Sequence, residues 1–240
     1  VNINTSGIVW EIAKDNKTLI QPLTSLKGLG DKAMTQIIEN RPFDNIESLL
    51  FNENITYAKL NKKALDVLVR SEALNGLIDE RFSGVKHFWS ATVVDRPKNL
   101  KKFKENIEAY QPEGDFTSSE KINNLVSLTG VFPIDLVMSN SLLKQLEQHK
   151  VPPLGEWDNE LGVAWLIPRE IIEKKTKNGK VYWILKVIDN TSTITGIKCW
   201  GVKPERDTIQ LNRPYMATLD YSEQWGFSTR SIKYNFRMLI

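Results

Sequence analysis

The sequence predicts a multidomain α+β chain in which an all-α domain is followed by a small five-stranded β-barrel. Apolar residues recur at helical spacing between residues 19 and 80, as Ala33 and Ile37 illustrate. After residue 161 apolar and polar residues alternate at the period of two that is typical of strands. A chain of 240 residues, 41% of them hydrophobic, can form two modest cores, which favours more than one domain.

Five segments in the last third of the chain have the alternation expected of strands. They are residues 161–167, 181–188, 194–200, 215–219 and 231–236. The first two are joined through residues 176–180, where Asn178-Gly179 supplies the positive φ angles of a tight hairpin turn. So many strands within so short a stretch indicate a small barrel of the OB type.

A hairpin with two glycines is the strongest motif in the helical region. Gly28-Leu29-Gly30 places an apolar residue between two glycines, just before a helical run. The glycines let the backbone approach another molecule closely, so the amides that open the second helix can point at a phosphate. An ordinary glycine C-cap is the alternative interpretation. Small Ala33 and a second unit at residues 60–65 favour a tandem helix-hairpin-helix.

The predicted DNA contacts of this helical domain lie in the two hairpin units and would be made to phosphates, independently of base sequence. They are Lys27, Gly28, Leu29, Gly30, Lys32, Asn61, Lys62 and Lys63.

The barrel offers a second candidate DNA surface. Residues 161–240 contain 13 Lys and Arg against 7 Asp and Glu, so this third of the chain is basic, as suits a polyanion partner. Strand parity places alternate residues of 181–188 on the outer face. Aromatic stacking with lysines on the phosphates would bind single strands, although aromatics in small barrels also form the core. The predicted contacts are Lys177, Lys180, Tyr182, Lys186, Lys198 and Trp200.

The order of motifs resembles the alpha subunit of bacterial replicative DNA polymerase III, the family C polymerases. The resemblance lies in residues 1–7, in residues 26–33 with the Gly28-Leu29-Gly30 hairpin, in residues 42–49 and in residues 61–65. It implies that the hairpins bind duplex DNA, that the barrel binds single-stranded template, and that the polymerase catalytic region is a partner. The family's Asp-x-Asp pair does not occur in this sequence, so we expect no catalytic residue and no cofactor here. Mg²⁺ would belong to a palm domain elsewhere.

A short peptide between the two regions suggests the sliding clamp as a candidate partner. Family members contain a clamp-binding peptide that begins with glutamine and ends in apolar residues and phenylalanine. Gln111 and Phe116 keep only these two ends. A plain loop is the alternative interpretation.

These interpretations define the expected domain boundaries. They are 1–18, the end of a fingers-like segment; 19–80, the tandem helix-hairpin-helix; 81–118, a linker; 119–155, a helical connector; and 156–240, the OB-type domain.

Composition excludes several other classes of protein. The single cysteine, Cys199, excludes an internal disulfide, and two histidines cannot assemble a zinc site with it. No apolar run is long enough to span a membrane, so we expect a cytoplasmic protein of a bacterial or phage-infected cell. A freestanding, non-catalytic phage DNA-binding protein remains the alternative to a polymerase segment.

Overall fold

The structure is a computed structural model that describes residues 1–191 and 195–239. It divides into two compact units, Val1–Phe132 and Pro133–Ile240. Each unit has its own hydrophobic core, and each is described by itself.

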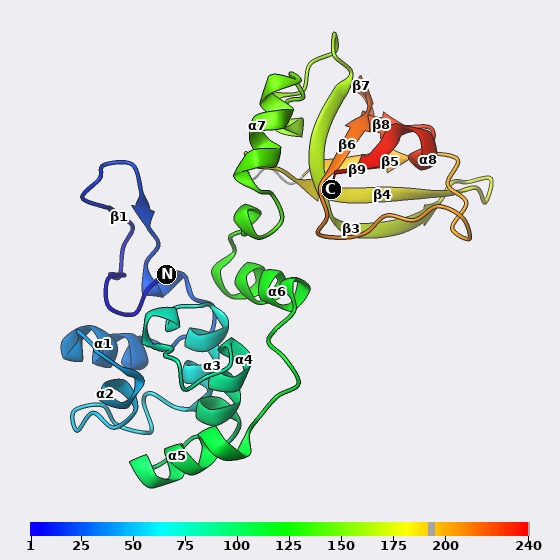
Figure 1. Ribbon diagram of the computed structural model, residues 1–240. Helices are drawn as coiled ribbons and strands as arrows, with labels where there is room; N and C mark the ends of the chain where they lie inside the picture. The colour runs from blue at the N-terminus through cyan, green and yellow to red at the C-terminus, as the bar shows by residue number, and fades with distance from the viewer. Residues whose placement is uncertain (192–194, 240) are drawn as a thin grey trace. The chain divides into compact units, whose positions relative to one another are not determined.

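Unit 1 is mainly helical (Figure 1). Its elements are β1 (Glu11–Ile12), β2 (Leu19–Ile20), η1 (Leu23–Ser25), α1 (Asp31–Asn40), α2 (Ile46–Leu50), α3 (Lys62–Arg70), η2 (Asn75–Leu77), α4 (Val85–Trp89), the π-helical η3 (Ser90–Val94), α5 (Leu100–Ala109) and α6 (Ser118–Thr129).

Side-chain caps determine where several of these helices begin. Asn45 and Thr117 form capping boxes at the starts of α2 and α6, while Asn61 and Asn99 accept hydrogen bonds from the first turns of α3 and α5. Each cap satisfies a backbone N–H that has no partner within its helix. α1 differs, because its N-cap is Gly30 and no side chain caps it.

The segment 81–118 differs from the predicted linker. It contains α4, η3 and α5, and it contributes Phe88, Ala91 and Phe103 to the core of unit 1 with exposures of 0%. Most of its charged residues lie on the surface, with Arg96 as a buried exception, while a few apolar residues at irregular spacing point inward. The predicted connector 119–155 is also divided, because α6 belongs to unit 1 and α7 to unit 2.

The first residues of the chain pack onto the helices. Ile3 is 1% exposed, and its N–H donates to the carbonyl of Ala73. β1 and β2 then pair as an antiparallel ribbon that projects from the helices of unit 1 (Figure 1). The predicted boundary at residue 18 therefore falls inside this ribbon.

Unit 2 combines short helices with a curled sheet (Figure 1). Its elements are η4 (Ile134–Leu136), α7 (Asn140–Gln148), η5 (Leu154–Glu156), β3 (Val163–Lys175), β4 (Val181–Ile188), β5 (Thr195–Cys199), β6 (Tyr215–Thr218), β7 (Asp220–Ser222), β8 (Gly226–Thr229), α8 (Ile232–Asn235) and β9 (Phe236–Met238).

The sheet has seven strands in the order β7-β8-β5-β4-β3-β6-β9. The long β3 pairs with β6 through its first half and with β4 through its second half, with a register irregularity between Pro168 and Glu170. β5 pairs in parallel with β8, and the other pairs are antiparallel. Only Leu219 separates β6 from β7 in the chain, although these strands lie toward opposite ends of the strand order.

The strand predictions are partly correct. β4 has the predicted bounds, and β3 starts near residue 161 but extends to Lys175. The predicted strand 231–236 is wrong, because residues 232–235 form α8 and only Phe236 enters β9. β7 and β8 are too short to show a period of two in the sequence. Of the predicted strand 194–200, Ile194 lies outside the described residues.

The turn between β3 and β4 uses one positive φ angle instead of two. Gly179 has a φ of 75°, and its N–H donates to the carbonyl of Thr176. Asn178 is not among the described residues with positive φ. Because the loop spans 176–180, a single left-handed residue is sufficient to reverse the chain.

Candidate nucleic-acid interface

The two hairpins predicted from the sequence meet around one groove of unit 1. Its volume is about 630 Å³. The lining comes from the start of α1 on one side and from the turn before α3 on the other. It consists of Gly28, Gly30, Asp31, Lys32, Ala33, Ala58, Lys59, Asn61, Lys63 and Ala64.

Gly28 is favoured by the backbone conformation of the first hairpin. Its φ of 95° lies in the left-handed region that side chains disfavour. A Cβ atom here would lie 3.4 Å from Cγ2 of Val67 and 3.7 Å from Cε of Lys63. Gly28 therefore allows the first hairpin to turn against α3.

Gly30 has a different environment. Its φ of −80° and ψ of 150° suit any residue, and a Cβ atom built on it would meet no atom within 4 Å. No contact with another described residue therefore requires glycine at this position. Open space at the uncapped start of α1 is what a close approach by a ligand backbone needs.

Buried Gln36 ties the two hairpins together. It belongs to α1 and is 8% exposed. Its Nε2 donates to the carbonyl of Asn54, and its Oε1 accepts from the N–H of Thr56. One side chain of the first hairpin's helix thus holds the loop that leads into the second hairpin. Gln36 was not predicted, because an isolated glutamine has no recognisable sequence pattern.

Three lysines against one carboxylate give the groove a positive charge. Lys32 and Lys63, both predicted, line it together with Lys59, which was not predicted. Asp31 is the acidic residue in the lining. Lys59 lies just before the second motif, and its neighbours gave no helical or glycine signal.

Other predicted contacts of unit 1 have different surroundings. Leu29 is 7% exposed, and its N–H donates to the carbonyl of Leu26, so this residue packs in the core. The Nζ of Lys62 donates to the carbonyl of Val94 at 2.8 Å. Lys27 is exposed but does not line the groove. The Oδ1 of Asn61 caps α3 by accepting from the N–H of Ala64 at 3.0 Å.

The outer face of β4 and β5 gathers the residues predicted for the barrel. Trp183 and Leu185 are buried, whereas Tyr182 and Lys186 are half-buried, as strand parity predicts. The rings of Tyr182 and Trp200 stack with centroids 4.6 Å apart. Gly196 pairs opposite Lys186, and a Cβ atom on it would make ordinary contacts with Cγ2 of Ile184 at 3.5 Å and with Nζ of Lys186 at 3.7 Å.

Trp225 adds an aromatic side chain that the sequence analysis missed. It lies in the turn between β7 and β8 and is 59% exposed. The Nζ of Lys198 lies 4.8 Å from its ring centroid and donates to its carbonyl at 3.0 Å. Because β7 and β8 were not predicted, nothing in the sequence placed Trp225 beside Lys198. Lys177 and Lys180 are exposed in the turn between β3 and β4.

Both ends of the predicted clamp peptide are engaged within unit 1. The ring of Phe116 packs edge to face on Trp89, with centroids 6.2 Å apart. Gln111 donates from Nε2 to the carbonyl of Ile107. Between them, Asp115 accepts from the N–H of Lys86 at 2.8 Å. A clamp could bind this peptide only after Phe116 left Trp89.

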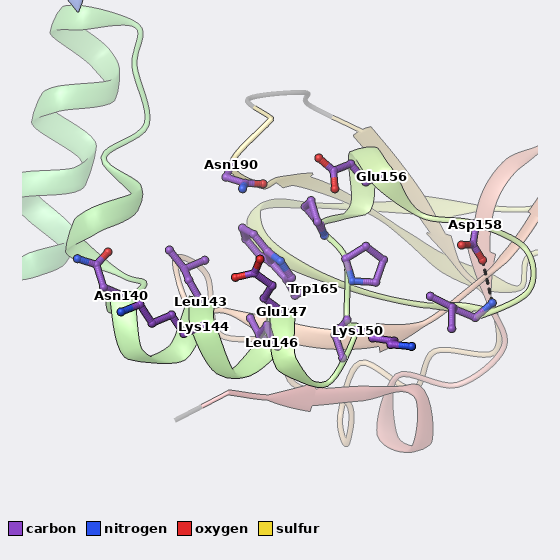
Figure 2. Close-up of a pocket in the computed structure, with 14 residues that line it drawn as sticks. Asn140, Leu143, Lys144, Leu146, Glu147, Lys150, Glu156, Asp158, Trp165 and Asn190 are labelled. Carbon is purple, nitrogen blue, oxygen red and sulfur yellow. Dashed lines mark hydrogen bonds between the residues drawn. The ribbon is translucent and has the colours of Figure 1, made fainter. Parts of the chain in front are cut away.

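Unit 2 also contains a pocket of about 670 Å³ (Figure 2). Leu143 and Leu146 of α7 line it together with Trp165 of β3. Its charged residues are mixed in sign, with Lys144 and Lys150 against three carboxylates: Glu147, Glu156 and Asp158. Trp165 is only 2% exposed, so neither charge nor stacking favours nucleic acid in this pocket.

Comparison with known protein families matches residues 1–83 to the helix-hairpin-helix motif. The match includes both hairpins and the groove between them. Unit 1 therefore contains a helix-hairpin-helix domain, and the motif indicates nucleic-acid binding. No curated protein matches the chain. Among the described residues, none of the helices has both the length and the apolar character needed to cross a membrane.

Proposed function

We propose that the groove of unit 1 binds the phosphate backbone of duplex DNA. The observation that supports this most directly is the uncapped start of α1, which opens at Gly30 into a groove lined by Lys32, Lys59 and Lys63. Backbone amides at a helix start and the helix dipole both favour an anion. Contacts of this kind do not depend on base sequence.

We further propose that unit 2 is an OB-type barrel that binds single-stranded DNA. The pairing order supports it: β3, β4 and β5 form a meander, β8 adds in parallel to β5, and β6 and β7 are separated by one residue while pairing with β3 and β8. A five-stranded Greek-key barrel has this connectivity if β6 and β7 count as one bent strand. The ligand face would then comprise Tyr182, Lys186, Lys198 and Trp200, with the two turns beside it.

Together these two activities suit a segment of a replicative polymerase similar to family C. The β1–β2 ribbon supports this over a freestanding protein, because it exposes Ile8, Val9, Trp10, Ile12 and Leu19 at 56% or more. Several exposed apolar side chains close together in the chain are typical of a surface that contacts another protein. In a polymerase the catalytic region would cover the ribbon, and Mg²⁺ would belong to that region.

A charge-reversal series tests the two DNA sites. Fluorescence anisotropy would measure the binding of the 240-residue chain to duplex and single-stranded oligonucleotides over a range of salt concentrations. Lys32→Glu/Lys63→Glu should weaken duplex binding selectively, and Lys186→Glu/Lys198→Glu should weaken single-strand binding selectively. Lys144→Glu/Lys150→Glu makes the same charge change at the pocket of unit 2 and should alter neither. Equal losses in all three variants would show that only net charge matters.

The coding sequence upstream of Val1 tests the polymerase context. A palm domain with paired aspartates would support it. An upstream sequence without such a domain, combined with retained DNA binding, would favour the freestanding protein.

A further inference from the structure

Arg96 is a buried cation that has no carboxylate partner in the part of the chain that the structure describes. Its side chain is 6% exposed. Its Nη1 donates to the carbonyl of Tyr57 at 2.7 Å, and its Nε is buried without a hydrogen-bond partner. Among the described residues, none of the ion pairs involves Arg96. Burying a charge without a counter-charge costs free energy of folding, so other interactions must offset the burial of Arg96.

Tyr57 stabilises the positive charge of Arg96 through a contact weaker than an ion pair. The guanidinium carbon lies 3.9 Å from the ring centroid of Tyr57, within the range of a cation–π contact. Burial lowers the pKa of Arg96, but an arginine guanidinium stays protonated in proteins. The positive charge is therefore permanent.

This charge lies directly behind the second hairpin. Tyr57 precedes Ala58 and Lys59, which line the groove. The turn itself is closed by the N–H groups of Lys59 and Leu60, which both donate to the carbonyl of Thr56. Arg96 thus binds the residue that directly precedes Ala58 and Lys59 in the lining of the groove.

A second cation, at the start of α3, links the same two segments of the chain. The Nζ of Lys62 reaches the carbonyl of Val94, while Arg96 reaches back to the carbonyl of Tyr57. The two side chains form a reciprocal cross-link between residues 57–62 and residues 94–96. Residues 61 and 62 were predicted to belong to a DNA site, and residues 94–96 to a linker.

We propose that Arg96 is a positioning residue for phosphate binding by the second hairpin. It fixes the turn at residues 57–61 and places a permanent positive charge behind it, so that a DNA phosphate in the groove supplies the missing counter-charge. Arg96 does not contact the DNA itself. This inference rests on the proposed function, because it requires a phosphate in the groove.

The test compares Arg96→Met with Arg70→Met in the 240-residue chain. Both remove one arginine from unit 1, but Arg70 lies at the far end of α3 from the groove, about 12 Å along the helix axis from Lys62. Arg96→Met should weaken duplex binding about tenfold, which corresponds to the loss of one charge-assisted phosphate contact made by the hairpin that Arg96 positions. The slope of log K against log salt should become shallower by about 0.9, the value for one phosphate. Arg70→Met should leave affinity and slope unchanged.

A double-mutant cycle separates this role from a general effect on the fold. If Arg96 acts through the second hairpin, its substitution should cost little further affinity in a Lys63→Ala background, because residues that act as one unit are not additive. Additive losses would overturn the proposal. So would an Arg96→Met variant that unfolds at a lower temperature but keeps wild-type duplex affinity when folded.

Tyr57→Ala keeps the proposal testable if Arg96→Met does not fold. Tyr57 is 48% exposed, so its ring can be removed without opening the core. The Tyr57→Ala variant should bind duplex more weakly, while single-strand binding by unit 2 should stay unchanged. Unchanged duplex binding would refute the proposal. If the wild-type chain fails to bind duplex at low salt, the proposed function fails. If it binds and Arg96→Met binds equally well, only the role of Arg96 is refuted.

Discussion

Gly30→Ala is the sharpest perturbation of the first hairpin, because it adds one methyl group at a position where the free protein has room for it. The backbone of Gly30 already has dihedral angles that alanine adopts, and its Cβ would meet no atom within 4 Å. Alanine is a poorer N-cap than glycine, but it also lowers the entropy of the unfolded chain, and each effect is worth about 0.5–1 kcal/mol. The free energy of unfolding should therefore change little.

DNA binding should respond differently to the same methyl group. If a phosphate lies against the amides at the start of α1, the methyl group would displace it. A hydrogen bond to a charged group contributes about 1.5–3 kcal/mol, so duplex affinity should fall by at least about tenfold. The log–log slope of affinity against salt should change little, because a backbone amide has no net charge with which to release a counterion.

Gly76→Ala is the matched control. Gly76 is exposed in η2, and a Cβ atom on it would also meet no atom within 4 Å. Both variants would be compared by anisotropy with a labelled duplex and by urea denaturation. If Gly30→Ala binds duplex as tightly as Gly76→Ala, no ligand approaches the start of α1, and the argument from the open groove is refuted.

Three further predictions concern Gly28, Trp225 and Cys199. Gly28→Ala should lower the free energy of unfolding by about 1–2 kcal/mol, because its φ of 95° is left-handed; urea denaturation that showed no loss would contradict this. Trp225→Ala should weaken single-strand binding by about 1–3 kcal/mol in anisotropy titrations and leave duplex binding unchanged, whereas an equal loss for duplex would remove Trp225 from a strand-specific site. Burial raises the pKa of the Cys199 thiol to about 12 from its usual 9.0, so its contribution to stability is complete below pH 9 and is lost as the pH rises toward 12. The stability difference between the wild type and Cys199→Ala, measured by urea denaturation, should shift against the wild type across this range; a constant difference would contradict the prediction.

Local sequence patterns predicted the features that depend on neighbouring residues. The two glycines around Leu29 identified the first hairpin, because a left-handed turn followed by a helix start is a property of a few consecutive residues. Alternation along residues 181–188 identified both the bounds and the buried face of β4. The family match over residues 1–83 confirms the helix-hairpin-helix.

Other features could not be predicted because they depend on long-range pairing. Residues 81–118 have turn-forming residues and charges, and their helices are specified by the core that Phe88 and Phe103 enter. β7 and β8 have three and four residues, so they are strands only because of their partners. The segment 231–236 alternates like a strand, but its middle residues form the single turn of α8.

The sequence by itself determined that the chain contains a hairpin with two glycines followed by a second helical unit, an alternating β region and a basic last third, because each of these is a property of composition or of short-range spacing. Only the tertiary structure decided which side chains face the groove, since that depends on contacts between residues far apart in the chain. Lys59 lines the groove, Leu29 is buried in the core, and the Nζ of Lys62 donates to the carbonyl of Val94. Arg96 became part of the second hairpin because folding brought it 39 positions back along the chain to Tyr57, a proximity that no local pattern encodes.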